Sequence, residues 1–204
     1  MTTKEFWDER YSAPEYIFGT QPNAFLASQR DRLKAGMRAL AVADGEGRNG
    51  VWLAEQGLDV RSVEISPLAI EKAQRLAQER GVSMHFECAD LLAWDWGVAR
   101  FDLIAAIFIQ FVGPEGRAHI FRGMIDALKP GGLLLLQGYT PKQLEFKTGG
   151  PPVAENLYTE SLLKESFGEL EILHLHTHED FIAEGTHHHG MSALIDMVAQ
   201  KPQT

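Results

Sequence analysis

The sequence contains one cysteine, Cys88, so it has no internal disulfide framework and no cysteine-built zinc site. It has no stretch near the roughly 18 uncharged apolar residues that a membrane span needs. It also has no excess of basic residues, because 19 Lys and Arg stand against 28 Asp and Glu, a formal net charge of −9. An acidic chain attracts neither nucleic acid nor an anionic membrane, and we expect neither as a partner.

The first eleven residues are polar and acidic, unlike the basic and then apolar start of a secretory signal peptide. We therefore expect a cytoplasmic protein. A length of 204 residues is enough for one domain with a buried core. We expect a single domain over residues 1–204, with residues 1–36 forming an N-terminal lid and helix segment and residues 37–204 forming a sheet core.

Strand-like and helix-like segments alternate along most of the chain. Ser66 and Pro67 are typical of the start of one helix, and Gly81 of its end. Five strands that alternate with helices favour a doubly wound α/β fold, with a parallel sheet covered on both faces. The predicted strands are 38–43, 58–63, 82–88, 101–108 and 133–139, and the predicted helices are 22–34, 48–56, 66–80, 113–128 and 159–166.

The end of the chain has a different pattern. Residues 170–177 and 192–199 both have strand character, and no helix fits between them. We therefore expect these two strands to form an antiparallel hairpin with a long connecting loop, which completes a mostly parallel sheet of seven strands.

A glycine-rich segment follows the first predicted strand. Gly45, Gly47 and Gly50 have the spacing Gly-x-Gly-x-x-Gly, and Glu64 ends the next strand 19 residues after Gly45. This arrangement is typical of a site for an adenosine-containing cofactor, whose ribose hydroxyls can donate to such a carboxylate. The motif alone is compatible with NAD, FAD or S-adenosylmethionine. The acids Asp44 and Glu46 favour a cationic sulfonium over a diphosphate.

Further motifs extend this similarity. The sequence resembles the class I S-adenosylmethionine-dependent methyltransferases over most of its length, and within them the tellurite-resistance and thiopurine methyltransferase-like group. The resemblance implies a Rossmann-like methyltransferase fold with S-adenosyl-L-methionine as cofactor. The motifs that carry it are the glycine loop, Glu64, Ala89-Asp90-Leu91, Phe101-Asp102-Leu103-Ile104, Lys129-Pro130-Gly131-Gly132, the reversed final hairpin, the segment 45–54, and the leading segment with Phe6-Trp7-Asp8-Glu9-Arg10-Tyr11 and Tyr16-x-x-Gly19-x-x-Pro22-Asn23-x-Phe25-Leu26.

The resemblance also implies a set of cofactor contacts. Glu64 would hold the ribose, Asp90 would accept from the adenine amino group, and Trp7 with Tyr11 would form a lid. The full set of implied cofactor-binding residues is Trp7, Tyr11, Asp44, Gly45, Gly47, Asn49, Glu64, Ile65, Asp90, Leu91 and Ile107. The chain departs from the family at two positions, since Ala41 and Ala43 stand where an acid and a glycine are usual. Asp44 is the nearest acid that could replace the first.

The acceptor site is less well defined by sequence. Methyl transfer from a sulfonium is an in-line displacement that needs alignment and no protein nucleophile. We expect a small-molecule acceptor, with a soft thiol, selenium or tellurium nucleophile or a small metabolite as the leading classes. The residues expected around it are Tyr16, Phe18, Gln110, Phe111 and Tyr139. No catalytic residue is assigned, and the candidates for taking a proton are Glu184, His187 and His189.

Two other functions are compatible with parts of the sequence. An NAD-dependent oxidoreductase would use the same glycine loop, and a non-catalytic cofactor-binding protein would keep the fold without turnover. His174, His176 and His178 alternate along one predicted strand and share a face, which raises the question of a metal site. A solvated strand face explains the same spacing, and we expect no metal.

Overall fold

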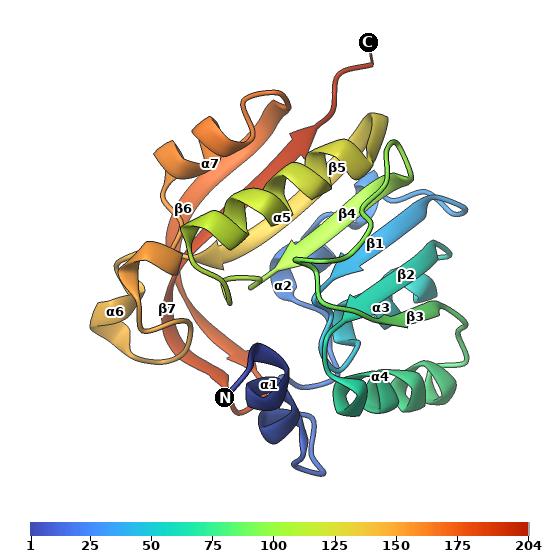
Figure 1. Ribbon diagram of the computed structural model, residues 1–204, viewed down its shortest axis with the longest axis vertical. Coiled ribbons are helices and arrows are strands. Elements are labelled where there is room, and N and C mark those ends of the chain that lie inside the picture. Colours follow the sequence, from blue (N-terminus) through green and yellow to red (C-terminus); the bar gives the residue numbers. More distant parts are fainter. Residues whose placement is uncertain (204) are drawn as a thin grey trace.

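Seven strands form one sheet in the order β3-β2-β1-β4-β5-β7-β6 in the computed structural model, which describes residues 1–203 (Figure 1). The first five strands are parallel, and β7 pairs antiparallel with both β5 and β6. The predicted doubly wound α/β fold and the antiparallel C-terminal hairpin are thus confirmed. The strands are β1 (Arg38–Val42), β2 (Asp59–Glu64), β3 (His85–Cys88), β4 (Phe101–Ile107), β5 (Leu128–Tyr139), β6 (Glu171–Glu184) and β7 (His188–Gln200).

The order of the strands reverses at β1, which lies between β2 and β4. Val42 of β1 is in register with Val63 of β2, and Ala41 is in register with Ala105 of β4. The carboxyl ends of these strands therefore lie at one edge of the sheet. In open α/β sheets, ligands bind outside this edge near the point of reversal.

Helices cover both faces of the sheet (Figure 1). One face carries α5 and α7, with Phe121 and Phe167 in a large apolar cluster, and the other carries α2 and α3, with Leu26 and Leu53. Both faces of the central strands are buried, as the continuous apolar run 133–136 requires. The helices are α1 (Thr3–Tyr11), α2 (Ala24–Ser28), α3 (Arg48–Glu55), α4 (Pro67–Glu79), α5 (Pro114–Ala127), α6 (Gln143–Phe146) and α7 (Glu160–Ser166).

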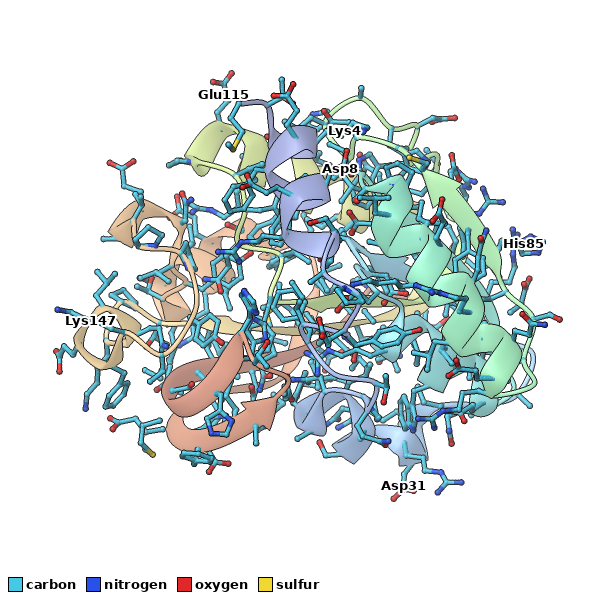
Figure 2. The ribbon with its side chains drawn as sticks, turned by 90° about the horizontal axis from the view of Figure 1, so that it is seen from below. Lys4, Asp8, Asp31, His85, Glu115 and Lys147 are labelled. Atoms are coloured by element: carbon cyan, nitrogen blue, oxygen red, sulfur yellow. The ribbon has the colours of Figure 1, made fainter. Side chains whose placement is uncertain are left out.

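The first helix, α1, lies beyond the carboxyl edge of the sheet beside α4. It starts with a capping box, in which the Thr2 side chain accepts from the Glu5 amide and the Glu5 carboxylate accepts from the Thr2 amide. The Ser66 hydroxyl at the start of α4 donates to Asp8 at 2.6 Å. Figure 2 shows Asp8 on α1 next to α4. This bond fixes α1 across the end of the sheet.

The helix expected over residues 22–34 is wrong in length. The structure has the five-residue α2, followed by a 3₁₀ turn at Arg30–Arg32. The Ser28 hydroxyl donates to the Phe25 carbonyl at 2.6 Å, and the Gln29 amide bonds back to the Leu26 carbonyl. A serine that bonds back to a carbonyl competes with the regular helical pattern. Such competition explains why the helix ends one turn after its start.

The expected long loop in the final hairpin is also wrong. Strands β6 and β7 are joined by residues 185–187 alone, and their pairing continues from Glu171↔Gln200 to Glu184↔His188. The turn contains Gly185 with φ +75°, a backbone conformation that glycine adopts without steric cost. Residues 178–184, expected in the loop, belong to the edge strand β6. No helix within residues 1–203 is long and apolar enough to cross a membrane.

Candidate active site

A cavity with about 910 Å³ of empty space, including its open mouth, lies at the carboxyl edge of β1, β2 and β4. Ten of the eleven residues expected to bind the cofactor line it. The exception is Gly47. The residues that line the cavity are Thr3, Trp7, Tyr11, Phe18, Ala43, Asp44, Gly45, Glu46, Arg48, Asn49, Glu64, Ile65, Ala89, Asp90, Leu91, Leu92, Ile107, Phe108, Phe111, Val112 and His188.

Two glycines of the loop after β1 have different tasks. Gly45 has φ +57°, and a Cβ at this position would lie 2.7 Å from the Tyr11 hydroxyl. Gly45 therefore lets α1 approach the loop. Gly47 has φ +87° and faces α4, because its Cβ would lie 2.5 Å from that of Ala73. The close packing of α3 against α4 requires glycine there, which is why Gly47 does not line the cavity.

Glu64 lies at the end of β2 with only 4% of its surface exposed. One carboxylate oxygen accepts from the Gly45 amide and the other accepts from the Ser66 amide, both at 2.9 Å. Burial raises the pKa of Glu64, and the backbone hydrogen bonds counteract this effect. Each oxygen keeps acceptor capacity, so the carboxylate can accept from a ribose diol while it holds the glycine loop.

The side chain of Asp44 bonds to the protein. Its two oxygens accept from the Gly50 amide at 3.0 Å and from the Ser62 hydroxyl at 3.1 Å. Burial raises the pKa of Asp44 to about 7. The carboxyl group connects the start of α3 to β2, and in this conformation it stabilises the loop. As in Glu64, each oxygen keeps acceptor capacity, and Asp44 lines the cavity.

The charge of the loop is lower than the sequence suggests. Glu46 is buried and forms an ion pair with Lys72 of α4 at 2.8 Å. It also accepts from the amides of Ile17 and Phe18, both at 3.2 Å. The expectation that Glu46 adds negative charge to the loop therefore needs correction, because Lys72 balances that charge. The acids at this edge that lie outside this ion pair are Asp44, Glu64 and Asp90.

Trp7 and Tyr11 lie on one side of α1, four residues apart. Their rings stack with centroids 5.5 Å apart and an interplanar angle of 21°. Burial raises the pKa of Tyr11, whose side chain lies near Glu64, Glu46 and Asp44. The pair covers the cavity from the side of α1, which is the place expected for a lid.

The two departures from the family pattern have structural correlates. Ala43 follows β1 with φ +47°, a left-handed conformation in which glycine is free of strain. Ala41 is buried in the apolar cluster beneath α2 and α3.

Across the cavity, Leu91 is buried and Ile65 is half-buried. The Asp90 carboxylate accepts from the Leu92 amide at 2.9 Å. These residues form the wall on the side of β2 and β3.

A second cavity, with about 1540 Å³ of empty space including its open mouth, adjoins the first. Four of the five residues expected around an acceptor line it: Phe18, Gln110, Phe111 and Tyr139. The residues that line the cavity are Met1, Thr2, Thr3, Phe6, Trp7, Arg10, Phe18, Phe108, Gln110, Phe111, Tyr139, Thr148, Gly149, Gly150, Pro151, Pro152, Asn156, Thr186, His187 and His188.

Tyr16 lies outside both cavities. Its hydroxyl donates to the Lys72 carbonyl at 2.9 Å, and its ring packs against α4. Gln110 lines the second cavity, but its amide group is used by the protein. It donates to the carbonyls of Tyr139 and Asn156 and accepts from the Tyr139 amide at 2.6 Å. Gln110 thus holds the walls of the cavity together.

The three candidates for taking a proton have different environments. Glu184 forms a buried ion pair with Arg48 at 2.7 Å and accepts from the side chain of Asn23. Because its oxygens hold these cationic and amide donors, Glu184 joins the hairpin to the N-terminal segment. His187 is exposed at the second cavity, and its ring bonds the Thr186 hydroxyl at 3.1 Å. His189 is exposed and packs against Phe181, away from both cavities.

The sequence analysis did not single out Thr3 or His188, and both residues line the two cavities, as Phe108 does. His188 lies directly opposite Glu184 in the hairpin and therefore points to the same face. Strand alternation could have found it, had the strands been predicted to their full length. Phe108 follows β4 with φ +55°, a strained conformation for a large side chain that often marks a functional site.

His174, His176 and His178 share one face of β6, as expected. The ring centroids of His176 and His178 are 5.5 Å apart, and His178 bonds Asp196 at 2.8 Å. Among residues 1–203, no group of three or more His, Cys, Asp or Glu side chains is arranged to hold a metal ion.

Comparisons with known proteins agree with this geometry. Residues 39–132 match a family model described as a methyltransferase domain. A thiopurine S-methyltransferase from Nitrosospira multiformis is 38% identical over 171 residues, which covers 74% of this chain and 76% of that protein. A protein-L-isoaspartate O-methyltransferase from Cytophaga hutchinsonii is 28% identical over 113 residues, or 54% of this chain. The match spans about half, 48%, of the length of that relative.

The fold is also similar to solved structures. The N-methyltransferase NodS from Bradyrhizobium japonicum WM9, crystallised in complex with S-adenosyl-L-homocysteine, superposes with a TM-score of 0.72. The superposition covers 99% of this chain and 100% of that chain at 14% identity. At this identity the likeness concerns the fold alone.

Proposed function

The chain belongs to the S-adenosylmethionine-dependent methyltransferases, and we propose that it transfers the donor's methyl group to a small molecule held in the second cavity. We further propose that the described chain acts as one methyltransferase domain, with residues 1–36 as its lid segment. The identity to a thiopurine S-methyltransferase supports a place in the thiopurine-like group. A soft nucleophile therefore remains our leading acceptor class. A cytoplasmic location stays a prediction.

One observation carries the proposal. The two cavities share a wall made of side chains that line both of them, mainly aromatic. A donor in the first cavity would therefore have its reactive end beside an acceptor in the second. Holding two reactants in line can contribute roughly 7–11 kcal/mol to catalysis. The shared residues are Thr3, Trp7, Phe18, Phe108, Phe111 and His188.

The residues of the first cavity fit the cofactor. The Gly45 amide holds the Glu64 carboxylate in place, and Glu64 offers acceptors at the position expected for a ribose. Asp90 and Leu91 lie across the cavity, where an adenine would meet one acceptor and one apolar surface. When bound, the cofactor supplies an electrophilic methyl group on a sulfonium.

The protein's own residues align the donor with the acceptor and exclude water from them. Trp7 and Phe18 cover the junction of the cavities, and aromatic rings near a cationic sulfonium add attraction of roughly 0.5–2 kcal/mol. The nucleophilic atom of the acceptor gains the methyl group, the sulfur keeps the electron pair of the broken bond, and the acceptor's proton passes to water.

Calorimetric titration tests the proposal. We expect the protein to bind S-adenosylhomocysteine and to be indifferent to NAD. At a ligand concentration 100 times Kd, the free energy of unfolding should rise by about 2.7 kcal/mol. Binding of NAD alone would support the oxidoreductase alternative. Binding of S-adenosylhomocysteine without methylation of any thiol, selenium, tellurium or heteroaromatic acceptor would support the non-catalytic alternative.

A further inference from the structure

We infer that Tyr139 and His188 recognise the methyl acceptor, and that this acceptor is an uncharged or anionic molecule with a hydrogen-bonding group beside its reacting atom. The inference rests on the proposed function, because it describes the kind of molecule that the second cavity takes.

Two residues that line this cavity each carry a buried polar atom with no hydrogen-bond partner within the described chain. These atoms are Nδ1 of His188 and the hydroxyl oxygen of Tyr139. The hydroxyl of Tyr158 is also unpartnered, but that ring packs in the core against Phe121. A buried polar group without a partner is unfavourable, so a ligand that supplies the missing partner is bound more tightly.

Tyr139 and His188 are held beside Phe108, at the junction of the two cavities. The ring of Phe108 stacks on Tyr139 with centroids 4.6 Å apart, and the ring of His188 meets Phe108 edge to face at 4.5 Å. The ring of His188 also packs against that of Phe18, with centroids 4.6 Å apart. Three aromatic contacts thus fix both polar groups next to the shared wall.

Both side chains are uncharged at neutral pH. Burial lowers the pKa of His188 to about 3, with smaller effects of Arg48, His187 and Arg10 in the same direction. Burial also raises the pKa of Tyr139. The imidazole is therefore too weak a base to keep an acceptor's proton. Nδ1 of the imidazole can donate or accept a hydrogen bond, according to the tautomer, and the phenol can donate one.

The charges around the second cavity limit the acceptor further. Although the chain has 28 acids, none of the residues that line this cavity is Asp or Glu. Arg10 lines it, with its guanidinium 4.8 Å from the ring centroid of Phe6 and 5.6 Å from that of Trp7. An ammonium group would find no carboxylate in this lining and would lie near a guanidinium, which favours an uncharged or anionic group.

Binding of two matched probes tests the inference without requiring turnover. Benzyl alcohol and benzylamine have the same ring, and only benzylamine is cationic at pH 7. Each is titrated by NMR into protein saturated with S-adenosylhomocysteine. We expect benzyl alcohol to bind at least 10-fold more tightly than benzylamine.

The variants His188→Phe and Tyr139→Phe keep the aromatic packing and remove one polar group each. We expect either to weaken benzyl alcohol binding by about 10-fold. Tyr139 does not line the first cavity, so Tyr139→Phe should change S-adenosylhomocysteine affinity less than about 2-fold. His174→Phe, an exposed histidine on β6, is the control and should match the wild type. Retention of S-adenosylhomocysteine binding shows that each variant is folded.

Three results would overturn the inference while leaving the proposed function intact. They are equal affinity of benzyl alcohol for the wild type and His188→Phe, binding of benzylamine as tight as that of the alcohol, and no binding of benzyl alcohol to the loaded wild type. Failure of the wild type to bind S-adenosylhomocysteine would instead overturn the proposed function.

Discussion

Arg48 at the start of α3 and Glu184 at the end of β6 form an ion pair of 2.7 Å, with side chains only 7% and 10% exposed. The pair joins residues 136 positions apart. It fixes the tip of the final hairpin against the glycine loop and Asn23. The arrangement of both cavities therefore depends on this contact.

We expect Glu184→Ala to lower the free energy of unfolding by about 3–5 kcal/mol, because it leaves the Arg48 guanidinium buried without its partner. Chemical denaturation measures this change. Glu179→Ala on the same strand is the control, since Glu179 pairs with Lys142 on the surface and its loss should cost less than about 1 kcal/mol. Equal effects of the two variants would contradict the structural role of Glu184.

Gly185 makes a second contact between the hairpin and the N-terminal segment. A Cβ at Gly185 would lie 2.3 Å from the Ile17 carbonyl oxygen, so we expect Gly185→Ala to separate the turn from residues 17–19. Gly81 has a similar φ of +67° but no atom within 4 Å of its built Cβ. Gly81→Ala should cost only the roughly 1–2 kcal/mol of left-handed strain. In thermal unfolding, Gly185→Ala should lose clearly more stability than Gly81→Ala.

Asp44 predicts a pH dependence of stability. Its pKa is about 7 in the folded state, against 3.8 ordinarily. The folded protein keeps this proton between pH 4 and 7 while the unfolded chain releases it, so the stabilisation is present below pH 4 and is lost as the pH rises to 7. Asp44→Asn does not titrate.

We therefore expect Asp44→Asn to gain stability relative to the wild type by roughly 1–4 kcal/mol between pH 4 and pH 7. Urea denaturation of both proteins across this range measures the difference. A difference that stays constant with pH would show that Asp44 ionises in the folded protein as it does in the unfolded chain.

The position of Glu64 leads to a prediction about the affinity for S-adenosylhomocysteine, the product that the cofactor leaves after methyl transfer. Glu64→Ala and Glu64→Gln should each weaken S-adenosylhomocysteine binding by at least about 10-fold in calorimetry, because the carboxylate offers acceptors to the ribose. The alanine variant should also lose roughly 1–3 kcal/mol of stability, since the amides of Gly45 and Ser66 lose their acceptor. Asp59→Asn, at the opposite end of β2, should leave the affinity unchanged.

Much of the architecture could be predicted from local signals. Alternating apolar runs, helix caps and glycine stops gave the order of strands and helices, and strand ends placed Glu64 and Asp90 at one edge. Local signals do not show which distant residue a polar side chain will bond. Residue type alone made three side chains candidates for the site: Tyr16, Glu46 and Glu184. In the structure each of them forms a hydrogen bond to a residue 26 to 161 positions away in the sequence. His188 was missed because its direction depends on the full length of β7.

The shared wall has a consequence for the second cavity. Trp7 borders both cavities and belongs to α1, which bonds to the start of α4 through Asp8 and Ser66. A swing of α1 that admits a nucleoside would remove one side of the neighbouring compartment at the same moment. That compartment is therefore closed on this side only while α1 lies in the position that the structure shows.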